Sequence, residues 1–372
     1  MINAHVHLFT IQSIPERFFG LRFIMKLMWS RLGVRVTRIL LSWVGNVLNH
    51  PQIDRLSAFA GIGAHASPRE VFELLQGYYP PDASFIVLPM DFEYMAAGRP
   101  KKSYMDQLDD LIQLKRDPHI GPRIYPFVAV DPRRPDLLQL VRHLVESEHF
   151  SGIKIYPALG FFPFDTRLDP LWQWAEALQI PIMTHCSRGG AYFRGPLSTF
   201  PWPKEAGPKP KPGTPNAKWT DLLSDPSGFK HVFQKYPNLK VCFAHMGGTE
   251  ECRKWLSEPW PKHLGQTNWL SIILELMKAF PQVYADISYS AYDAQIHPLI
   301  DVLVRDELIG RRILFGSDFY MVQQNMTERA FSIQIKSLLS NEAFHRISEI
   351  NTKQFLCREK PSRNDPFYTL HS

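Results

Sequence analysis

The chain has 372 residues, 45% of them hydrophobic, so it can bury a large core as one large domain or two ordinary ones. Its formal net charge of +6 is mildly basic. Lys and Arg form no long block with interleaved aromatic residues, so the charge argues against nucleic acid and favours an anionic small molecule or a membrane surface. The four cysteines lack Cys-x-x-Cys spacing, which predicts reduced thiols in a cytoplasmic protein.

The first residues carry no pattern of a secretory signal. Met1 is followed at once by a candidate strand, without a charged segment, an apolar segment and a cleavage site. Along the chain there is also no run of about 18 uncharged apolar residues that would predict a transmembrane helix. A cytoplasmic location is therefore the expectation.

Short apolar runs typical of buried strands recur along the chain and alternate with helix-like segments. Near-continuous apolar strands of this kind indicate a parallel sheet that is covered on both faces. Eight strand–helix units predict an α/β protein with a closed TIM (β/α)8 barrel, and an open doubly wound sheet is the alternative. The strand runs are residues 2–9, 84–89, 123–130, 152–157, 180–185, 239–245, 283–288 and 313–318, and helix-like segments include 136–147, 171–178 and 298–308.

Two segments are longer than the connections between strands and helices that a minimal barrel needs. The connection over residues 10–83 is far longer than usual, and within it residues 17–53 hold six Lys or Arg and no acid among many apolar residues. This pattern predicts two basic amphipathic helices broken near Gly33, serving as a helical cap on the barrel or a dimer contact, with peripheral membrane contact as the alternative. The second segment, residues 187–221, is rich in Pro and Lys and predicts a surface loop near the active face.

No repeat or linker divides the chain. We therefore expect one domain over residues 1–359, including the 10–83 helical insertion, followed by a C-terminal tail over residues 360–372.

Metal-binding residue types collect at the ends of the predicted strands. His5 and His7 lie two apart in the first strand, so both point to one face and suit two neighbouring positions on one metal ion. His185 ends the fifth strand, His245 the sixth and Asp318 the eighth. Barrel enzymes keep their chemistry at the carboxyl ends of the strands, so the sequence predicts a metal site there.

Four motifs carry a family resemblance: NAHVHLF, THCSRGG, FAHMGG and LFGSDF, in this order along the chain. Together they resemble the amidohydrolase superfamily of metal-dependent (β/α)8 enzymes, and most closely its amidohydrolase family 2 branch. That branch includes aminocarboxymuconate-semialdehyde decarboxylase, aromatic-acid decarboxylases, lactonases and hydratases. The resemblance covers nearly the whole chain apart from the 10–83 insertion and the tail.

The resemblance implies a role for each of these residues. His5, His7, His185 and Asp318 match the ligands of one divalent ion, most often zinc, and a bound water completes the shell. His245 matches a histidine that stays off the metal and activates the water or polarises the substrate, and Asp318 can also shuttle a proton. Neutral imidazoles with one carboxylate suit zinc on chemical grounds as well.

Further residues near these strand ends are candidate substrate contacts. Lys154 is expected to anchor an anion. The alternatives are a carboxylated lysine that bridges two metals, as in other branches of the superfamily, and a lysine paired with a carboxylate of the barrel. Arg188 could grip a substrate carboxylate, or form a loop salt bridge. Tyr156 shares the face of Lys154 and is expected to line the pocket, and Asp286 could orient a metal ligand or cap a helix.

The expected reaction is hydrolysis of a carboxylate-bearing ester, lactone or amide by a metal-activated water. The alternative is non-oxidative decarboxylation of an aromatic or unsaturated acid. A histidine at position 5 favours hydrolysis, because many decarboxylases of this branch carry an acidic residue at the matching position. A third reading is a membrane- or partner-binding protein on a barrel that has lost its activity.

Overall fold

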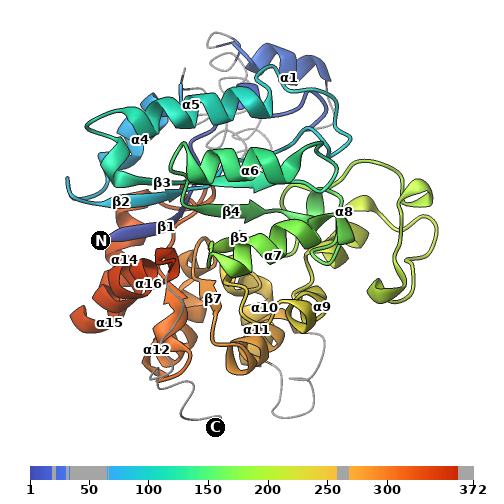
Figure 1. Cartoon of the computed structure of the whole chain (residues 1–372). Helices are drawn as coiled ribbons and strands as arrows, with labels where there is room; N and C mark the ends of the chain where they lie inside the picture. The colour runs from blue at the N-terminus through green and yellow to red at the C-terminus, as the bar shows by residue number, and fades with distance from the viewer. Residues whose placement is uncertain (19–21, 31–32, 34–64, 66, 258–267, 359–372) are drawn as a thin grey trace, which may run out of the picture.

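Eight parallel strands follow one another around the sheet in sequence order from β1 to β8 (Figure 1). The structure is a computed structural model, and it describes residues 1–18, 22–30, 33, 65, 67–257 and 268–358. The predicted TIM barrel is confirmed, because a doubly wound sheet would reverse its strand order part-way across. The strands are β1 (Ile2–Val6), β2 (Ser84–Val87), β3 (Ile124–Val130), β4 (Gly152–Ile155), β5 (Ile182–Thr184), β6 (Val241–Phe243), β7 (Val283–Asp286) and β8 (Ile313–Leu314).

The barrel is nearly closed between β8 and β1. The strand ladders of the described chain run from the β1–β2 pair to the β7–β8 pair and do not include β8–β1. Two backbone hydrogen bonds cross this seam instead, from Ala4 N to Phe315 O at 2.7 Å and from Asp318 N to His5 O at 2.8 Å. The amide of Phe315 donates to Ile347 O, outside the sheet.

Amphipathic helices surround the strands. In α5, Ser103 and Asp106 form a capping box at the N-terminus, and Leu108, Leu111 and Leu114 form a buried stripe three residues apart. Most of the other surrounding helices also turn an apolar face to the sheet. The helices around the sheet are α5 (Tyr104–Arg116), α6 (Leu137–Glu146), α7 (Asp169–Ala177), α9 (Gly228–Lys235), α10 (Thr249–Ser257), α11 (Trp269–Ala279), α12 (His297–Arg305) and α14 (Glu328–Leu338).

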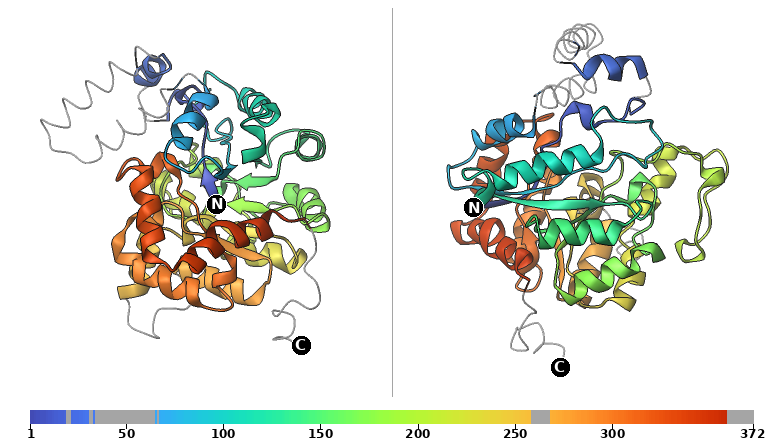
Figure 2. Two further views of the ribbon diagram at one scale, coloured as in Figure 1. Left: turned by 90° about the vertical axis from the view of Figure 1, so that its left-hand side faces the viewer. Right: turned by 45° about the horizontal axis from the view of Figure 1, so that its top comes forward.

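The end of the barrel where the strands begin is closed by the C-terminal helices α15 (Asn341–His345) and α16 (Asn351–Leu356) (Figure 2). Phe355 of α16 packs in a buried cluster with the inward side chains Ile86, Phe127 and Leu314. This apolar floor leaves the opposite, carboxyl end of the strands for polar side chains.

The β1–β2 connection is helical where it is described. It contains η1 (Ile11–Ser13), α1 (Arg22–Met28) and α4 (Pro68–Gln76), and α4 begins at a Ser67 cap followed by Pro68. In α1, Met25 is buried and Phe23 is 79% exposed. Most of the predicted amphipathic segment 17–53 lies outside the described residues, as does nearly all of the predicted tail. The roles of both segments, and the domain division, stay predictions.

The Pro- and Lys-rich loop has more structure than its composition suggested. It contains the short turns η5 (Leu197–Thr199) and η6 (Lys204–Ala206) and the short helix α8 (Asn216–Trp219). Phe200 and Trp219 of this loop are buried against Phe162. These aromatic residues anchor the loop, and a reading based on Pro and Lys content overlooked them.

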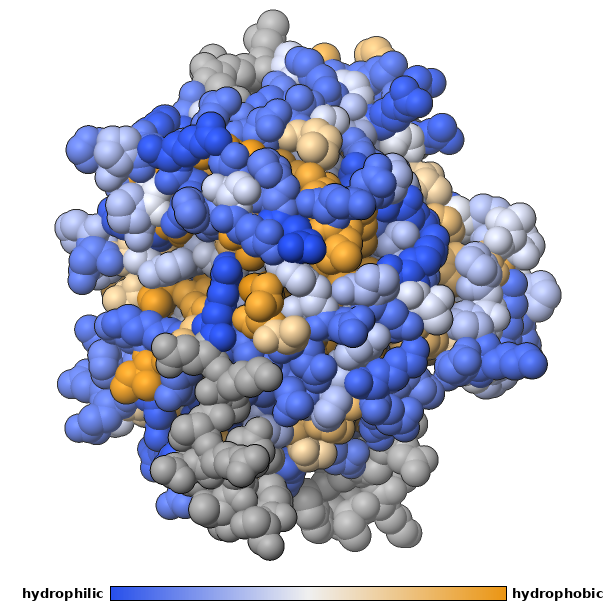
Figure 3. Space-filling view, viewed as in Figure 1, coloured by the Kyte–Doolittle hydropathy of each residue, from blue (hydrophilic) through white to orange (hydrophobic). Residues whose placement is uncertain are grey.

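The surface seen in Figure 3 is largely hydrophilic, and apolar residues occur on it in separate small groups. Among the helices of the described residues, none combines the length and the apolar character that crossing a bilayer requires.

Candidate metal centre

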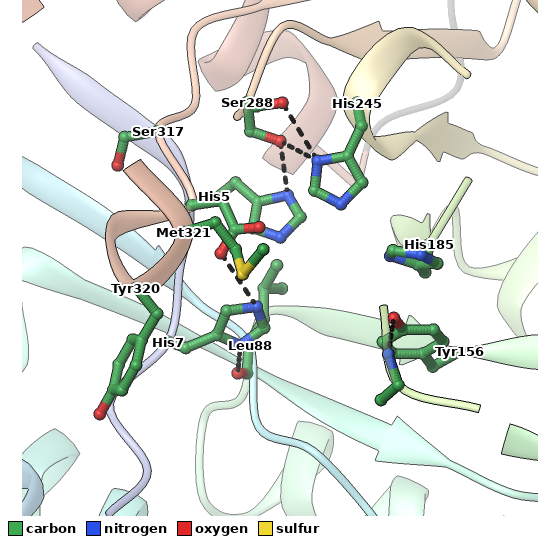
Figure 4. A network of polar contacts seen from close by, with 12 residues as sticks. His5, His7, Leu88, Tyr156, His185, His245, Ser288, Ser317, Tyr320 and Met321 are labelled. Carbon is green, nitrogen blue, oxygen red and sulfur yellow. Dashed lines mark hydrogen bonds and ion pairs between the residues drawn. The ribbon is translucent and has the colours of Figure 1, made fainter. Parts of the chain in front are cut away.

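The ends of three strands bring the predicted histidines to one place (Figure 4). His5 lies in β1 and His7 directly follows it, His185 directly follows β5, and His245 lies in the turn η8 (Ala244–Met246) after β6. The ring centroid of His5 lies 5.3 Å from that of His7 and 4.8 Å from that of His245, which is 5.0 Å from His185. Asp318 follows β8, and its carboxylate lies 3.7 Å from His7 Nε2. The predicted convergence is therefore present.

Three of these residues form the tightest group of donors. One possible ligand atom each from His5, His245 and Asp318 lies within 4.8 Å of the others. The sequence reasoning instead placed His245 off the metal and His7 and His185 on it. In the structure His185 Nε2 lies 3.2 Å from Ser187 Oγ. Which imidazoles bind the ion stays a prediction, and the geometry includes His245 among the candidates.

Two of the site residues have left-handed backbone conformations. His245 has φ of +65° and Asp318 has φ of +57°, which costs roughly 1–2 kcal/mol each for a residue with a side chain. Hydrogen bonds hold both in place, since His245 N donates to Asp286 and Asp318 N donates to the His5 carbonyl. Strained backbone that surrounding contacts hold in this way gathers at functional sites.

Asp286 and Ser288 orient two of the imidazoles. The Asp286 carboxylate lies 2.9 Å from His5 Nδ1, and Ser288 Oγ lies 3.1 Å from His5 Nδ1 and 2.9 Å from His245 Nδ1. A proton on His5 Nδ1 satisfies the carboxylate and leaves Nε2 as a free acceptor, as metal-binding histidines require. Asp286 was a candidate for this orienting role, whereas Ser288 was missed. The sequence signal available for Ser288 was its position two residues after Asp286.

A backbone carbonyl orients His7 in the same way. Its Nδ1 lies 2.6 Å from Leu88 O, so that nitrogen carries the proton and Nε2 faces Asp318 as an acceptor. Met321, in α13 (Phe319–Val322), reaches over the same group of side chains in Figure 4 and was not singled out from the sequence.

Burial keeps the four imidazoles neutral. It lowers the pKa of His7 and His245 to about 3, and it also depresses the pKa values of His5 and His185 well below the usual range. Burial raises the pKa of Asp318 to about 8, because no cation fully compensates its charge. Neutral imidazoles around a carboxyl group whose charge is only partly compensated, by Lys154, form a donor set that fits a divalent cation.

Lys154 lies on the same side of the barrel. It is 2% exposed, its Nζ has no hydrogen-bond partner, and burial lowers its pKa to about 8. With Tyr156, Asp91, Asp131 and others it lines a cavity of about 10 Å³, room for about one water-sized group. The role of Lys154 as an anchor for a substrate anion stays a prediction.

Tyr156 supports His185 from below. Their rings stack with centroids 3.8 Å apart, and the Tyr156 hydroxyl accepts the amide of Ala191. A Cβ on Gly190 would lie 2.5 Å from that hydroxyl, and Gly190 has φ of +82°, so only glycine lets the loop approach so closely. Tyr156 lines the pocket as expected, and its contact with substrate stays a prediction.

Arg188 has protein partners in this structure. Its Nε donates to Glu251 at 2.9 Å, and its guanidinium lies 4.3 Å above the centroid of Trp269. The alternative of a loop salt bridge describes this arrangement, and a substrate contact by Arg188 stays a prediction.

The amidohydrolase family Amidohydro_2 matches residues 2–356, so the chain belongs to this family. The resemblance found in the four motifs is thereby confirmed over nearly the whole chain. A comparison with curated protein sequences gave no match.

Two solved structures with TM-scores above 0.5 support the fold. An uncharacterized TIM-barrel protein from Bordetella bronchiseptica aligns with 14% identity and a TM-score of 0.55, covering 96% of this chain and 99% of the other. A zinc-bound amidohydrolase from Burkholderia multivorans aligns with 11% identity and a TM-score of 0.51, covering 95% and 98%. 2,6-Dihydroxybenzoate decarboxylase from Rhizobium aligns with 14% identity and a TM-score of 0.47, covering 77% and 87%.

Proposed function

We propose that the protein is a metal-dependent hydrolase that cleaves a carboxylate-bearing ester, lactone or amide. The observation that carries this proposal is the group of neutral imidazoles and one buried carboxylate at the carboxyl end of the barrel, with acceptor atoms of His5, His245 and Asp318 within 4.8 Å. Nitrogen and oxygen ligands of this kind suit zinc, the ion named for the Burkholderia multivorans protein.

His5 and Asp318 would hold the ion together with two or more of His7, His185 and His245. A divalent ion supplies a water whose pKa falls to about 7, and it polarises a carbonyl oxygen. The protein keeps the donors ready for this role, because Asp286 and the Leu88 carbonyl hold the protons of His5 and His7 on Nδ1.

Asp318 and His245 are the proton carriers in this proposal. Either group, within reach of the donor set, can take the proton from the attacking water and return it to the leaving alcohol or amine. Lys154 pairs with the substrate carboxylate, because its buried ammonium has no hydrogen-bond partner among the residues that the structure describes. Tyr156 holds His185 at the wall of the pocket.

Non-oxidative decarboxylation is the second candidate. This reaction must deliver a proton to the carbon that loses carbon dioxide. Asp318 or His245, both within reach of the donor set, could deliver this proton. Lys154 would hold the acid in the same way in both reactions.

A substrate panel distinguishes the two reactions. We expect the zinc-loaded protein to release acid from lactones, esters or N-acyl compounds that bear a carboxylate, and to release no carbon dioxide from hydroxybenzoic acids. His5→Ala plus His7→Ala should abolish turnover and zinc binding, whereas His345→Ala, which replaces a histidine at the floor, should change neither. Carbon dioxide release without hydrolysis would favour the second candidate. A wild-type protein that binds no divalent ion would overturn both.

A further inference from the structure

His5 and Asp318 face each other across the seam between β8 and β1. No strand ladder sets the spacing of these two strands, because β8 has only two residues and the amide of Phe315 donates outside the sheet. The two backbone hydrogen bonds at Ala4 and Asp318 are the main-chain contacts across this seam in the described residues. The distance between the two candidate ligands therefore depends on these two bonds and on side-chain contacts across the seam.

The side chain of Asn3 spans this seam. Its Oδ1 accepts the backbone amides of His5 and Ser317, each at 3.1 Å, so one oxygen ties the residue that bears an imidazole ligand to the neighbour of Asp318. Its Nδ2 donates to the hydroxyls of Tyr79 and Ser317, each at 2.8 Å, and lies 3.4 Å from Glu328 Oε1. Asn3 is 1% exposed.

The surrounding groups require an amide with this orientation. Two N–H donors face one end of the side chain, and the Glu328 carboxyl, which is fully buried and accepts from Tyr79 Oη at 2.5 Å, faces the other. A carboxylate at position 3 would set two acceptors against each other, and an apolar residue would leave the amides of His5 and Ser317 without acceptors.

We propose that Asn3 is a positioning residue for the metal site: its amide clamps the β8–β1 seam and sets the separation of His5 and Asp318. Glu328 and Tyr79 hold the amide in the orientation that this role needs. The inference rests on the proposed function, because it assumes that the ion binds between these strands. Asn3 touches neither the ion nor the substrate, and it acts through the backbone of the residues that do.

A swap of donor and acceptor tests this role. Asn3→Asp places a carboxylate against Glu328, and adding Glu328→Gln restores a donor–acceptor pair with the polarity reversed. The control is Asn351→Asp, another buried amide, which donates to the carbonyls of Gly310 and Ile313 at the other end of β8. For each protein, zinc affinity is measured by competition with a chromogenic chelator, and the unfolding free energy of the metal-free protein is measured in urea.

We expect Asn3→Asp to weaken zinc binding roughly 10–100-fold, as loss of an outer contact to metal ligands does. The double variant should recover most of this affinity, and Asn351→Asp should lower stability while leaving zinc affinity unchanged. Asn3→Asp with normal zinc affinity, or a double variant as weak as the single one, would overturn the clamp. If Asn3→Asp does not fold, the double variant decides alone, and its failure to fold would also count against the role.

The same measurements distinguish failure of the Asn3 clamp from failure of the proposed function. If the wild-type protein binds no zinc, the metal site itself is wrong. If the wild-type protein and Asn3→Asp bind zinc equally well, the metal site stands and only the clamp is wrong.

Discussion

The two ends of the barrel each bury a lysine, and the two lysines differ in their hydrogen-bond partners. Lys154 at the carboxyl end and Lys240 at the floor are each 2% exposed, and burial lowers the pKa of both to about 8. Lys240 Nζ donates to the carbonyls of Gln354 and Cys357, which ties α16 to the barrel. Lys154 Nζ has no such partner.

The comparison extends to the surroundings of the two lysines. At the floor, apolar side chains fill the space around Phe355, whereas at the carboxyl end four neutral imidazoles surround a carboxyl group whose charge Lys154 compensates only in part. A polar group that is buried without its partner lowers stability. The floor thus stabilises the fold, whereas the unpartnered polar groups at the carboxyl end lower the stability of the metal-free protein and are available to bind a ligand.

The largest effect is expected at Asp318. Asp318→Asn removes the carboxylate from the donor set, and we expect activity to fall by roughly 10²–10⁴-fold, the usual loss for a group that transfers protons. Zinc content should fall with it, while the melting temperature of the metal-free protein stays equal or rises. Asp301→Asn, at a surface ion pair of α12, is the matched control. An active, zinc-loaded Asp318→Asn protein would contradict the site.

The second largest effect is expected at the apolar floor of the barrel. Phe355→Ala leaves a cavity between α16 and the barrel, and we expect it to lower the free energy of unfolding by about 3–5 kcal/mol in urea titrations. Zinc stoichiometry at 25 °C should stay at the wild-type value, because the ligands lie at the other end. Phe355→Leu keeps most of the volume and should cost less. Loss of zinc binding by the folded Phe355→Ala protein would show that the two ends are not independent.

A matched pair of substitutions tests the contrast between the lysines. Lys240→Met should destabilise the metal-free protein by about 1–3 kcal/mol, because two carbonyls lose their donor. Lys154→Met should stabilise it by about 1 kcal/mol, because it removes a buried amine without a partner, and it should raise KM for a carboxylate substrate. Urea unfolding of both variants measures the sign of each change in the free energy of unfolding. Equal signs would mean that Lys154 has structural partners after all.

The smallest effect is expected at Arg188. Its contacts with Glu251 and Trp269 predict that Arg188→Ala lowers stability by about 1 kcal/mol, the magnitude of a partly exposed ion pair and a cation–π contact. KM should change little. A KM at least tenfold higher with unchanged stability would instead identify Arg188 as the substrate anchor predicted from the sequence.

Local patterns were sufficient for the strands and for the list of candidate site residues. Apolar runs that alternate with amphipathic helices predict a (β/α)8 barrel, and in such a barrel all carboxyl strand ends meet at one face. His5, His185, His245 and Asp318 could therefore be grouped although they are far apart in the sequence. The short turns of the 187–221 loop were not predicted, because Phe200 and Trp219 are buried by Phe162 of another segment.

By itself, the sequence determined which chemical groups reach the carboxyl face, since strand periodicity and barrel topology are local or nearly local properties. Only the tertiary structure decided which of these groups have partners. Arg188 meets Glu251, Asn3 meets Glu328, and Lys154 meets no hydrogen-bonding group. Partnership depends on the distances and orientations of side chains brought together by the closed barrel, which one-dimensional spacing does not encode.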